Sequence, residues 1–365
     1  MKLRKLLSAG LIFVFIISQV SCSDSKMKTV VAIVGNQIYI NGELTYKGRQ
    51  WKGNNIEGLL FNSRMVQGTF DDLNPETRNT FIYPDTKVWN ANRNTDEFVA
   101  AMSEWRSYGL LAITLNMQGG SPMGYGNQRG WINSAFDKTG NLVPDYMNRL
   151  ERILNKADEL GMVVILGYFY FGQDQLLQNE EAVVRAVDSI SNWILDKGYR
   201  NILVEINNEC NIQYDHEILQ PQRVHKLIER VQSIQKDGNH LLVSTSYGGG
   251  FVPLPNVVKT ADYILLHGNG VKNSSDITKL IEDTRKVDGY KPIPIIFNED
   301  DHFNFESDTS NFVTAVRAYS SWGYFDYRMN GEGFADGYQS VPVDWGINSE
   351  RKKGFFKKLK EIVGD

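Results

Sequence analysis

The chain has 365 residues, of which 42% are hydrophobic and 22% charged, and its formal net charge is −4. This composition, with 32 Gly and 10 Pro, is typical of a globular protein and excludes a disordered chain, a collagen-like repeat and a small disulfide-stabilised fold. Phosphate binding requires a surplus of Lys and Arg on one face, so the acidic balance also predicts that nucleic acid is not a partner.

Residues 1–21 are typical of a secretory signal peptide. Lys2, Arg4 and Lys5 precede an apolar stretch over residues 6–20, which is short of the roughly 20 apolar residues that a membrane-spanning helix needs. Cys22 then lies where a bacterial lipoprotein carries its acylated cysteine. We therefore expect an exported protein, periplasmic or on the cell surface, whose only membrane contact is a lipid anchor in a bacterial outer membrane. Plain secretion is the alternative.

Residues 22–55 are predicted to form a tether followed by a short β-hairpin. Residues 30–46 read as two short strands around Asn41-Gly42, a dipeptide that suits a tight hairpin turn. The main domain is expected to follow, over residues 56–365.

From residue 56 onward, short apolar runs alternate with stretches of helical period. Apolar runs of this kind are typical of strands that are buried on both faces. Eight strand–helix units predict an α/β fold, a (β/α)8 TIM barrel. A doubly wound open sheet is the alternative, but its Gly-rich phosphate turn is missing after the first run. The predicted strands are residues 56–62, 110–116, 162–168, 202–207, 241–245, 263–267, 293–298 and 324–328.

Two of these predicted strands lead directly into a glutamate. Glu209 follows the fourth strand and Glu299 the seventh, and their separation of 90 residues fits three βα units of about 30 residues. The carboxyl ends of barrel strands form the mouth in which barrel enzymes build their sites. Two carboxyl groups across that mouth suit glycosidic cleavage, in which one is the acid and the other the nucleophile or base. The alternative is that both glutamates cap helices or form ion pairs.

The strand ends resemble glycoside hydrolase family 5 and its clan A relatives. Residues 204–209, Val-Glu-Ile-Asn-Asn-Glu, are similar to the Tyr-Glu-Ile-Ala-Asn-Glu-Pro motif on the family's fourth strand. Residues 295–299, Ile-Ile-Phe-Asn-Glu, resemble the nucleophile segment on its seventh strand, and residues 264–267, Ile-Leu-Leu-His, resemble its His-x-Tyr segment.

The resemblance implies a retaining hydrolase that cleaves a β-linked oligo- or polysaccharide by double displacement. It implies Glu209 as acid/base, Glu299 as nucleophile, Asn208 as hydrogen-bond donor to the substrate 2-hydroxyl, and His267 as a residue that lines the site. We expect further substrate contacts from Arg64, Asn116, Trp131, Tyr168 and Tyr327.

Several positions depart from the family pattern. Cys210 replaces the usual Pro, and Asn269 stands where the Tyr of the sixth strand would orient the nucleophile. Tyr327 stands at the position of a Trp, Tyr168 at that of a His and Thr114 at that of an Arg. Arg64, at the end of the first strand, is placed to supply the missing positive charge near Glu299.

These departures keep two rival functions open. One is a non-catalytic saccharide-binding surface lipoprotein on a degenerate barrel, and the other is a structural surface protein with neither activity. The five His residues show no metal-ligand spacing, so we expect neither a metal nor another cofactor. Glu205 is expected to be a hydrogen-bonded structural carboxylate, and Asp300 and Asp301 are expected to cap or to face solvent. The sequence does not indicate an oligomeric state.

Overall fold

The computed structural model describes residues 27–125 and 130–364. The predicted signal peptide and Cys22 lie outside the described residues, so export and lipid anchoring stay predictions.

The barrel strands run parallel and in the predicted order. A six-stranded parallel sheet has the order β12-β9-β8-β7-β6-β15, and β13 pairs with β14. A parallel bridge between Ile296 and Ser321 joins β14 to the segment before β15, and the Asp262 amide donates to the Val243 carbonyl between β12 and β13. The predicted (β/α)8 barrel is therefore confirmed. Its strands are β6 (Asn62–Arg64), β7 (Ala112–Asn116), β8 (Val163–Tyr170), β9 (Ile202–Asn208), β12 (Leu242–Ser244), β13 (Ile264–His267), β14 (Ile295–Glu299) and β15 (Gly323–Tyr324).

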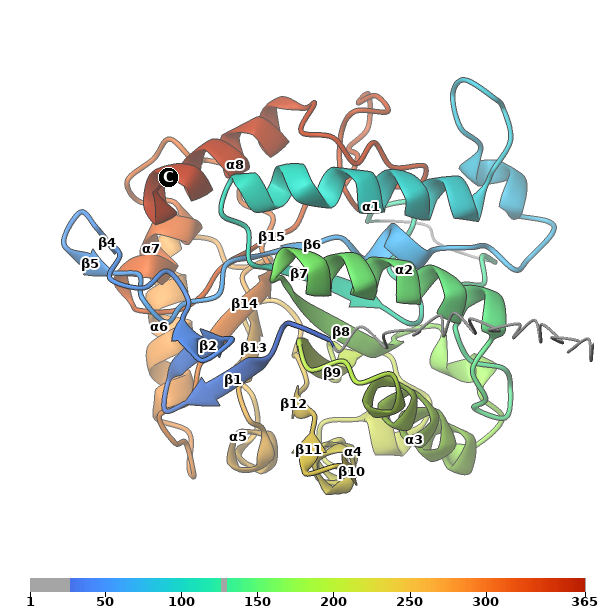
Figure 1. Cartoon of the computed structure of the whole chain (residues 1–365), viewed down its shortest axis with the longest axis horizontal. Coiled ribbons are helices and arrows are strands. Elements are labelled where there is room, and N and C mark those ends of the chain that lie inside the picture. The colour runs from blue at the N-terminus through green and yellow to red at the C-terminus, as the bar shows by residue number, and fades with distance from the viewer. Residues whose placement is uncertain (1–26, 126–129, 365) are drawn as a thin grey trace, which may run out of the picture.

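The helices alternate with these strands along the chain and surround them (Figure 1). Their buried residues recur at helical spacing, as Val183, Val187, Ile190 and Ile194 do in α3, because one apolar face packs against the barrel. The α-helices are α1 (Ala91–Ser107), α2 (Pro144–Leu160), α3 (Glu180–Asp196), α4 (His225–Ser233), α5 (Pro255–Thr260), α6 (Ser274–Arg285), α7 (Asn311–Arg317) and α8 (Glu350–Val363). Short 3₁₀ helices are η1 (Val66–Thr69), η2 (Arg78–Phe81), η3 (Asp174–Leu176) and η4 (Glu217–Leu219).

A small antiparallel sheet precedes the barrel and closes its N-terminal end. It consists of β1 (Val31–Val34), β2 (Gln37–Ile40) and β3 (Glu43–Leu44). The predicted hairpin around Asn41-Gly42 joins β2 to β3, with both turn residues at positive φ, and β1 adds a third strand. Val31 and Ile38 pack with Leu60, Val163 and Leu203 from the barrel. Two further hairpins are β4 (Gln50–Trp51) with β5 (Asn54–Asn55), and β10 (Gln235–Lys236) with β11 (Asn239–His240).

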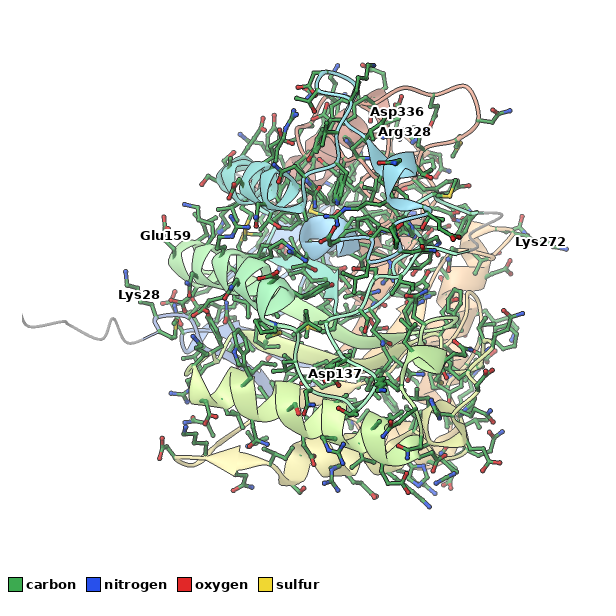
Figure 2. The ribbon with its side chains drawn as sticks, turned by 90° about the vertical axis from the view of Figure 1, so that its right-hand side faces the viewer. Lys28, Asp137, Glu159, Lys272, Arg328 and Asp336 are labelled. Atoms are coloured by element: carbon green, nitrogen blue, oxygen red, sulfur yellow. The ribbon has the colours of Figure 1, made fainter. Side chains whose placement is uncertain are left out.

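Long connections leave the C-terminal ends of the strands. Residues 65–90 follow β6, residues 117–143 follow β7, and a third long segment, residues 325–349, follows β15. In Figure 2, Lys28 before β1 and Lys272 after β13 lie on opposite sides of the molecule, which marks the two ends of the barrel. None of the helices over the described residues combines the length and the apolar character that crossing a membrane requires.

Candidate active site

The structure brings the two predicted glutamates together at the barrel mouth. Glu299 is the last residue of β14, and Glu209 directly follows β9. Their carboxylates and the ring of His267, at the end of β13, have ligand atoms that all lie within 4.8 Å of one another. The Glu209 side chain is 14% exposed and that of Glu299 is 6% exposed. Two acidic groups therefore meet in a nearly dry site that still opens to solvent.

Glu299 has one ion-pair partner and one hydrogen-bond donor. Arg64 Nε lies 2.9 Å from Glu299 Oε2, and Asn269 Nδ2 donates to Glu299 Oε1 over 2.7 Å. Arg64 also donates through Nη2 to Asn208 Oδ1 at 3.0 Å. Arg64 is in register with Thr114, the position at which the family pattern has an Arg. The guanidinium thus reaches the site from the neighbouring strand.

His267 contacts both glutamates. Its Nδ1 lies 3.0 Å from Glu209 Oε1 and 3.6 Å from Glu299 Oε2, and its side chain is fully buried. Burial disfavours the charged imidazole, but the two carboxylates outweigh burial, so that the pKa of His267 is raised. A proton on His267 can therefore serve either carboxylate.

The two glutamates differ in pKa because their surroundings differ. Burial raises the pKa of Glu299, and the charges of Arg64 and His267 oppose this rise without cancelling it. Burial acts in the same direction on Glu209, but the hydrogen bond and charge of His267, together with Arg64, outweigh it, so that the pKa of Glu209 is lowered. The surroundings therefore shift the pKa values of the two glutamates in opposite directions.

Glu209 has a strained backbone. Its φ is 54°, in the left-handed region that a non-glycine residue rarely adopts. Ser246 fixes this turn, because its Oγ accepts from the Glu209 amide at 2.9 Å and its carbonyl accepts from the Cys210 amide at 2.9 Å. Strict alternation would have placed Asn207 on the same face as Glu209. Instead Asn207 donates to the Leu219 carbonyl, so the strand end departs from alternation.

Aromatic rings stand beside Glu299. The ring centroid of Tyr125 lies 4.5 Å from that of Tyr327 and 5.6 Å from that of Phe325. Asn269 Nδ2, which donates to Glu299, also donates to the Tyr125 hydroxyl at 2.8 Å. Tyr125 is 51% exposed, so part of its ring is free to contact a ligand. Tyr327, a predicted contact residue, thus lies near the site. The sequence signal for Tyr125 was its position in a Gly-rich loop after the second predicted strand, where an aromatic ring suits stacking on a sugar, with packing as the alternative.

Three other predicted contact residues do not reach the two glutamates. Tyr168 was wrongly placed, because it points outward to α3, where its hydroxyl lies 3.1 Å from Ser191 Oγ. The Trp131 indole is buried in the core and its carbonyl accepts from Gln173 Nε2 at 3.2 Å, so its role as a contact residue stays a prediction. Asn116 faces the barrel interior next to Glu205 and lies below the site.

Tyr170, two residues after Tyr168, approaches the site instead. Its hydroxyl lies 2.7 Å from Ser121 Oγ, and the charge of Glu299 adds to burial in raising its pKa. The sequence signal for Tyr170 was its place at the carboxyl end of a buried strand, and Tyr168 carries the same signal.

Two groups of side chains have the spacing of metal ligands over the described residues: Glu209, His267 and Glu299, and Asp300, Asp301 and His302. Arg64 beside Glu299 opposes a cation at the first group. Asp300 in the second group is already occupied, because it accepts from Trp322 Nε1 at 2.9 Å and Asn311 Nδ2 at 3.0 Å. The donor sets therefore suit acid–base chemistry and structural hydrogen bonding better than a metal centre.

Comparisons with known proteins agree with this fold. No family model and no curated protein matches the sequence. Among solved structures, a glycoside hydrolase family 5 protein from Bacteroides vulgatus matches with a TM-score of 0.56 and 14% identity over 92% of this chain and 71% of that chain. The endo-1,4-β-mannanase from Rhizomucor miehei matches with a TM-score of 0.56 and 13% identity over 92% and 99%.

The native form of a β-glucanase from Saccharophagus degradans matches with a TM-score of 0.55 and 12% identity over 93% of this chain and 96% of that chain. At these identities the likeness concerns the fold, so the activity must be argued from the site. The chain has the (β/α)8 barrel fold of glycoside hydrolase family 5 structures.

Proposed function

We propose that the protein is a retaining glycoside hydrolase that cleaves a β-linked oligo- or polysaccharide by double displacement. The observation that carries this proposal is the pair of carboxylates at the barrel mouth, with oxygens within 4.8 Å of each other. Retaining enzymes hold the two carboxyl groups about 5–5.5 Å apart and inverting enzymes about 6.5–9.5 Å apart. Two carboxylate oxygens within 4.8 Å of each other fit the smaller separation of the retaining enzymes better than the larger one.

In the first step, Glu299 attacks the anomeric carbon while Glu209 gives its proton to the glycosidic oxygen, which leaves as an alcohol. In the second step, Glu209 takes a proton from water, the hydroxide attacks the anomeric carbon, and the bond to Glu299 breaks. The contacts of Glu299 with Arg64 at 2.9 Å and with Asn269 at 2.7 Å orient the attacking carboxylate. Arg64 donates to Asn208 Oδ1, which leaves the NH2 group of Asn208 to donate to the substrate hydroxyl.

The first step needs a proton on Glu209, whose pKa is lowered, while that of Glu299 is raised. Glu209 must therefore receive a proton before the first step. His267 offers a route, because its Nδ1 is within 3.0 Å of one carboxylate and 3.6 Å of the other. Substrate binding also displaces water from the more exposed Glu209, and loss of water raises the pKa of a carboxyl group.

A carbohydrate substrate fits the rim of the site. Tyr125 and Tyr327 present an aromatic surface next to Glu299, and rigid rings bind a sugar face at low entropic cost. Two of the structures with the same fold are a β-mannanase and a β-glucanase. We infer that the substrate of this chain is likewise a β-linked glycan.

A mechanism-based inhibitor tests the proposal directly. A 2-deoxy-2-fluoro β-glycoside should form a stable ester, and peptide mass spectrometry should find it on Glu299. The Glu209→Ala variant should hydrolyse a glycoside with a good leaving group and be accelerated by azide, whereas Glu299→Gln should be inactive. Binding without turnover across a panel of aryl glycosides and glycans, unchanged by Glu299→Gln, would instead indicate the saccharide-binding lipoprotein.

We also propose that the protein is exported and anchored by a lipid on Cys22, with residues 22–55 as tether and N-terminal sheet. Expression in a bacterial host with labelled palmitate should label the wild type in the outer-membrane fraction. The Cys22→Ser variant should lose the label and leave that fraction. Equal membrane content of both forms would contradict the anchor.

A further inference from the structure

Polar side chains line the barrel interior beneath the two glutamates. Residues in register on parallel strands point to the same face of the sheet, which here is the interior. Barrel interiors are usually filled by bulky branched side chains, whereas this layer contains a glycine, an arginine and a glutamate. The register pairs are Arg64 with Thr114, Asn116 with Gly167, Gly167 with Glu205, and Glu205 with Ser244.

Many polar atoms of this layer are buried without a hydrogen-bond partner among the described residues. An unmade hydrogen bond on a buried group costs roughly 1–3 kcal/mol, and native proteins leave few of them. Buried water, which makes about three hydrogen bonds, is the usual partner at such places. The unpartnered atoms are Arg64 Nε and Nη1, Thr114 Oγ1, Asn116 Oδ1 and Nδ2, Glu205 Oε1, Ser244 Oγ and Asn298 Oδ1.

The set includes donors as well as acceptors, which suits water. The cationic guanidinium of Arg64 opposes a metal ion in the same space. Gly167 keeps a side chain out of the gap between Asn116 and Glu205, because a Cβ there would be 2.5 Å from Asn116 Oδ1 and 3.3 Å from Glu205 Oε2.

Arg64 and Glu205 each have polar atoms without a hydrogen-bond partner among the described residues. Arg64 forms an ion pair with Glu299 through Nε and donates a hydrogen bond to Asn208 through Nη2, while Nη1 contacts neither of these groups. Glu205 accepts from Asn298 Nδ2 at 3.3 Å through Oε2, which leaves Oε1. We propose that buried water in this layer links Arg64 Nη1 to Glu205 Oε1, and that Glu205 is a positioning residue that acts as the second counter-ion of Arg64.

This link affects the nucleophile through Arg64. Glu205 competes with Glu299 for the same guanidinium, and its charge adds to burial and to Glu209 in raising the pKa of Glu299. His267 and Arg64 oppose that rise, and the hydroxyls of Tyr170 and Tyr125 complete the titratable groups around the carboxylate. The charge of Glu205 thus contributes to the raised pKa of Glu299.

A high-resolution crystal structure of the unliganded wild type tests the water, whether or not the protein turns over a glycan. We expect ordered water within hydrogen-bonding distance of both Arg64 Nη1 and Glu205 Oε1, and its loss in Gly167→Ala. A dry layer, or an ion at metal–oxygen distances, would overturn the inference.

The positioning role rests on the proposed hydrolase activity and is tested by the pH profile of kcat/KM. The acidic limb reports the ionisation of Glu299, so Glu205→Gln, which removes a negative charge, should move that limb to lower pH by roughly half a unit or more. Glu151→Gln on α2 removes a distant carboxylate, paired with Lys197, and should leave the profile unchanged. A Glu205→Gln profile equal to wild type would refute the role, whereas absence of wild-type turnover would refute only the proposed function.

Discussion

Asn269 shows how a single residue can replace a missing family feature. The family pattern has a Tyr at this position that orients the nucleophile, and here an amide contacts the proposed nucleophile, because Asn269 Nδ2 donates to Glu299 Oε1 at 2.7 Å. The same nitrogen donates to the Tyr125 hydroxyl at 2.8 Å. The tyrosine thus comes from a loop after β7 instead of the sixth barrel strand, and it acts on the nucleophile through Asn269.

Removing this donor should impair the nucleophile. A hydrogen bond to a charged group contributes about 1.5–3 kcal/mol, so Asn269→Ala should lower kcat/KM by roughly 10- to 100-fold. Loss of the donor also raises the pKa of Glu299, so the acidic limb of kcat/KM should move to higher pH. Steady-state kinetics across pH measure both effects. Tyr125→Phe keeps the bond between Asn269 and Glu299 and should cost less. A wild-type rate in Asn269→Ala would show that the amide does not aim Glu299.

At the residue scale, the sequence predicted the site residues that lie at the carboxyl ends of the barrel strands. Glu209, Glu299, Arg64 and His267 each lie at or directly after the carboxyl end of a barrel strand, and parallel strands bring those ends together. Tyr125 lies 9 residues beyond Asn116, the last residue of β7, inside a long loop. No periodicity fixes the path of such a loop, so its approach to Asn269 could not be predicted.

At the element scale, the alternation of side chains along a strand accounts for the direction of some side chains but not of others. Alternation explains why Tyr168 in β8 points to α3 while its neighbour Gly167 faces the interior. The sequence shows a run of apolar residues without a polar face. It therefore does not indicate whether the odd-numbered or the even-numbered side chains of the strand face the barrel interior. Beyond Glu205, the strand end departs from alternation, because Asn208 faces Arg64 and Asn207 faces Leu219.

The segment Gly248-Gly249-Gly250 after β12 has a packing role at the site. The Gly250 amide donates to the His267 carbonyl at 3.1 Å. A Cβ at Gly249 would lie 1.6 Å from the Asn269 carbonyl oxygen. The close approach of two backbones therefore requires glycine at this position and sets where Asn269 lies.

Gly249→Ala should consequently displace Asn269 and its bond to Glu299. We expect at least a 10-fold loss of kcat/KM and a destabilisation of about 1–3 kcal/mol, the usual cost of overpacking. Gly248→Ala is the matched control, because its Cβ would meet Ile212 Cδ1 at an ordinary 3.4 Å. Activity and thermal unfolding of both variants measure the difference. Equal behaviour of the two alanine variants would contradict the packing role.

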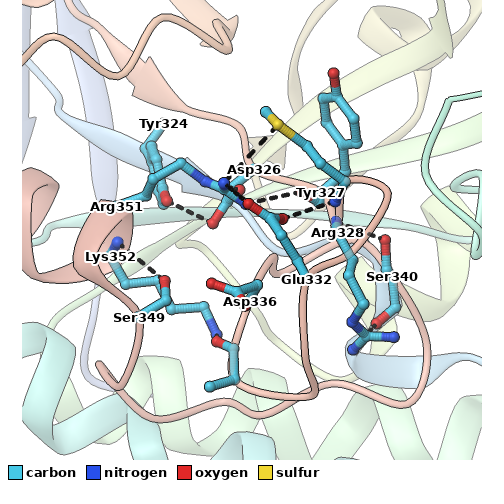
Figure 3. A network of polar contacts seen from close by, with 12 residues as sticks. Tyr324, Asp326, Tyr327, Arg328, Glu332, Asp336, Ser340, Ser349, Arg351 and Lys352 are labelled. Atoms are coloured by element: carbon cyan, nitrogen blue, oxygen red, sulfur yellow. Dashed lines mark hydrogen bonds and ion pairs between the residues drawn. The ribbon is translucent and has the colours of Figure 1, made fainter.

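At the scale of the whole molecule, the last helix and the segment before it close the barrel on the side of β15. Figure 3 shows the polar network that joins them. Arg351 of α8 pairs with Asp326 at 2.9 Å and with Glu332, and Tyr324 donates to Asp326 at 2.6 Å. Because residues 325–349 also carry Phe325 and Tyr327 to the rim, this network positions the aromatic surface beside Glu299.

Lys352 of α8 is fully buried in this region. Its Nζ donates to the carbonyls of Ala335 at 2.7 Å and Asp344 at 2.6 Å, and lies 4.1 Å from the ring centroid of Tyr338. Burial lowers the pKa of Lys352 to about 8, although nearby aspartates, Asp344 foremost, oppose the shift. The folded protein therefore binds this proton more weakly than the unfolded chain, whose lysine has a pKa near 10.5.

This difference predicts how stability depends on pH. Below pH 8 both states carry the proton, and the buried charge costs its full amount. Between pH 8 and about 10.5 the unfolded chain still holds the proton and the folded protein does not, so the free energy of unfolding rises with pH by up to about 1.4 kcal/mol per unit. Above pH 10 the buried tyrosines reverse the trend, because burial raises the pKa of Tyr324 and Tyr338 well above the ordinary value.

Lys352→Met isolates the contribution of the lysine from that of the tyrosines, which both proteins share. From pH 7 to pH 10 the wild type should gain roughly 2–3 kcal/mol of unfolding free energy relative to Lys352→Met, measured by urea denaturation at the two pH values. Lys353→Met changes the adjacent, exposed lysine, which pairs with Glu350, and should follow the wild type at both pH values. If Lys352→Met also followed the wild type, then the buried amine would not titrate in this range. Its hydrogen bonds to the two carbonyls would then hold the segment before α8 in place equally at pH 7 and pH 10.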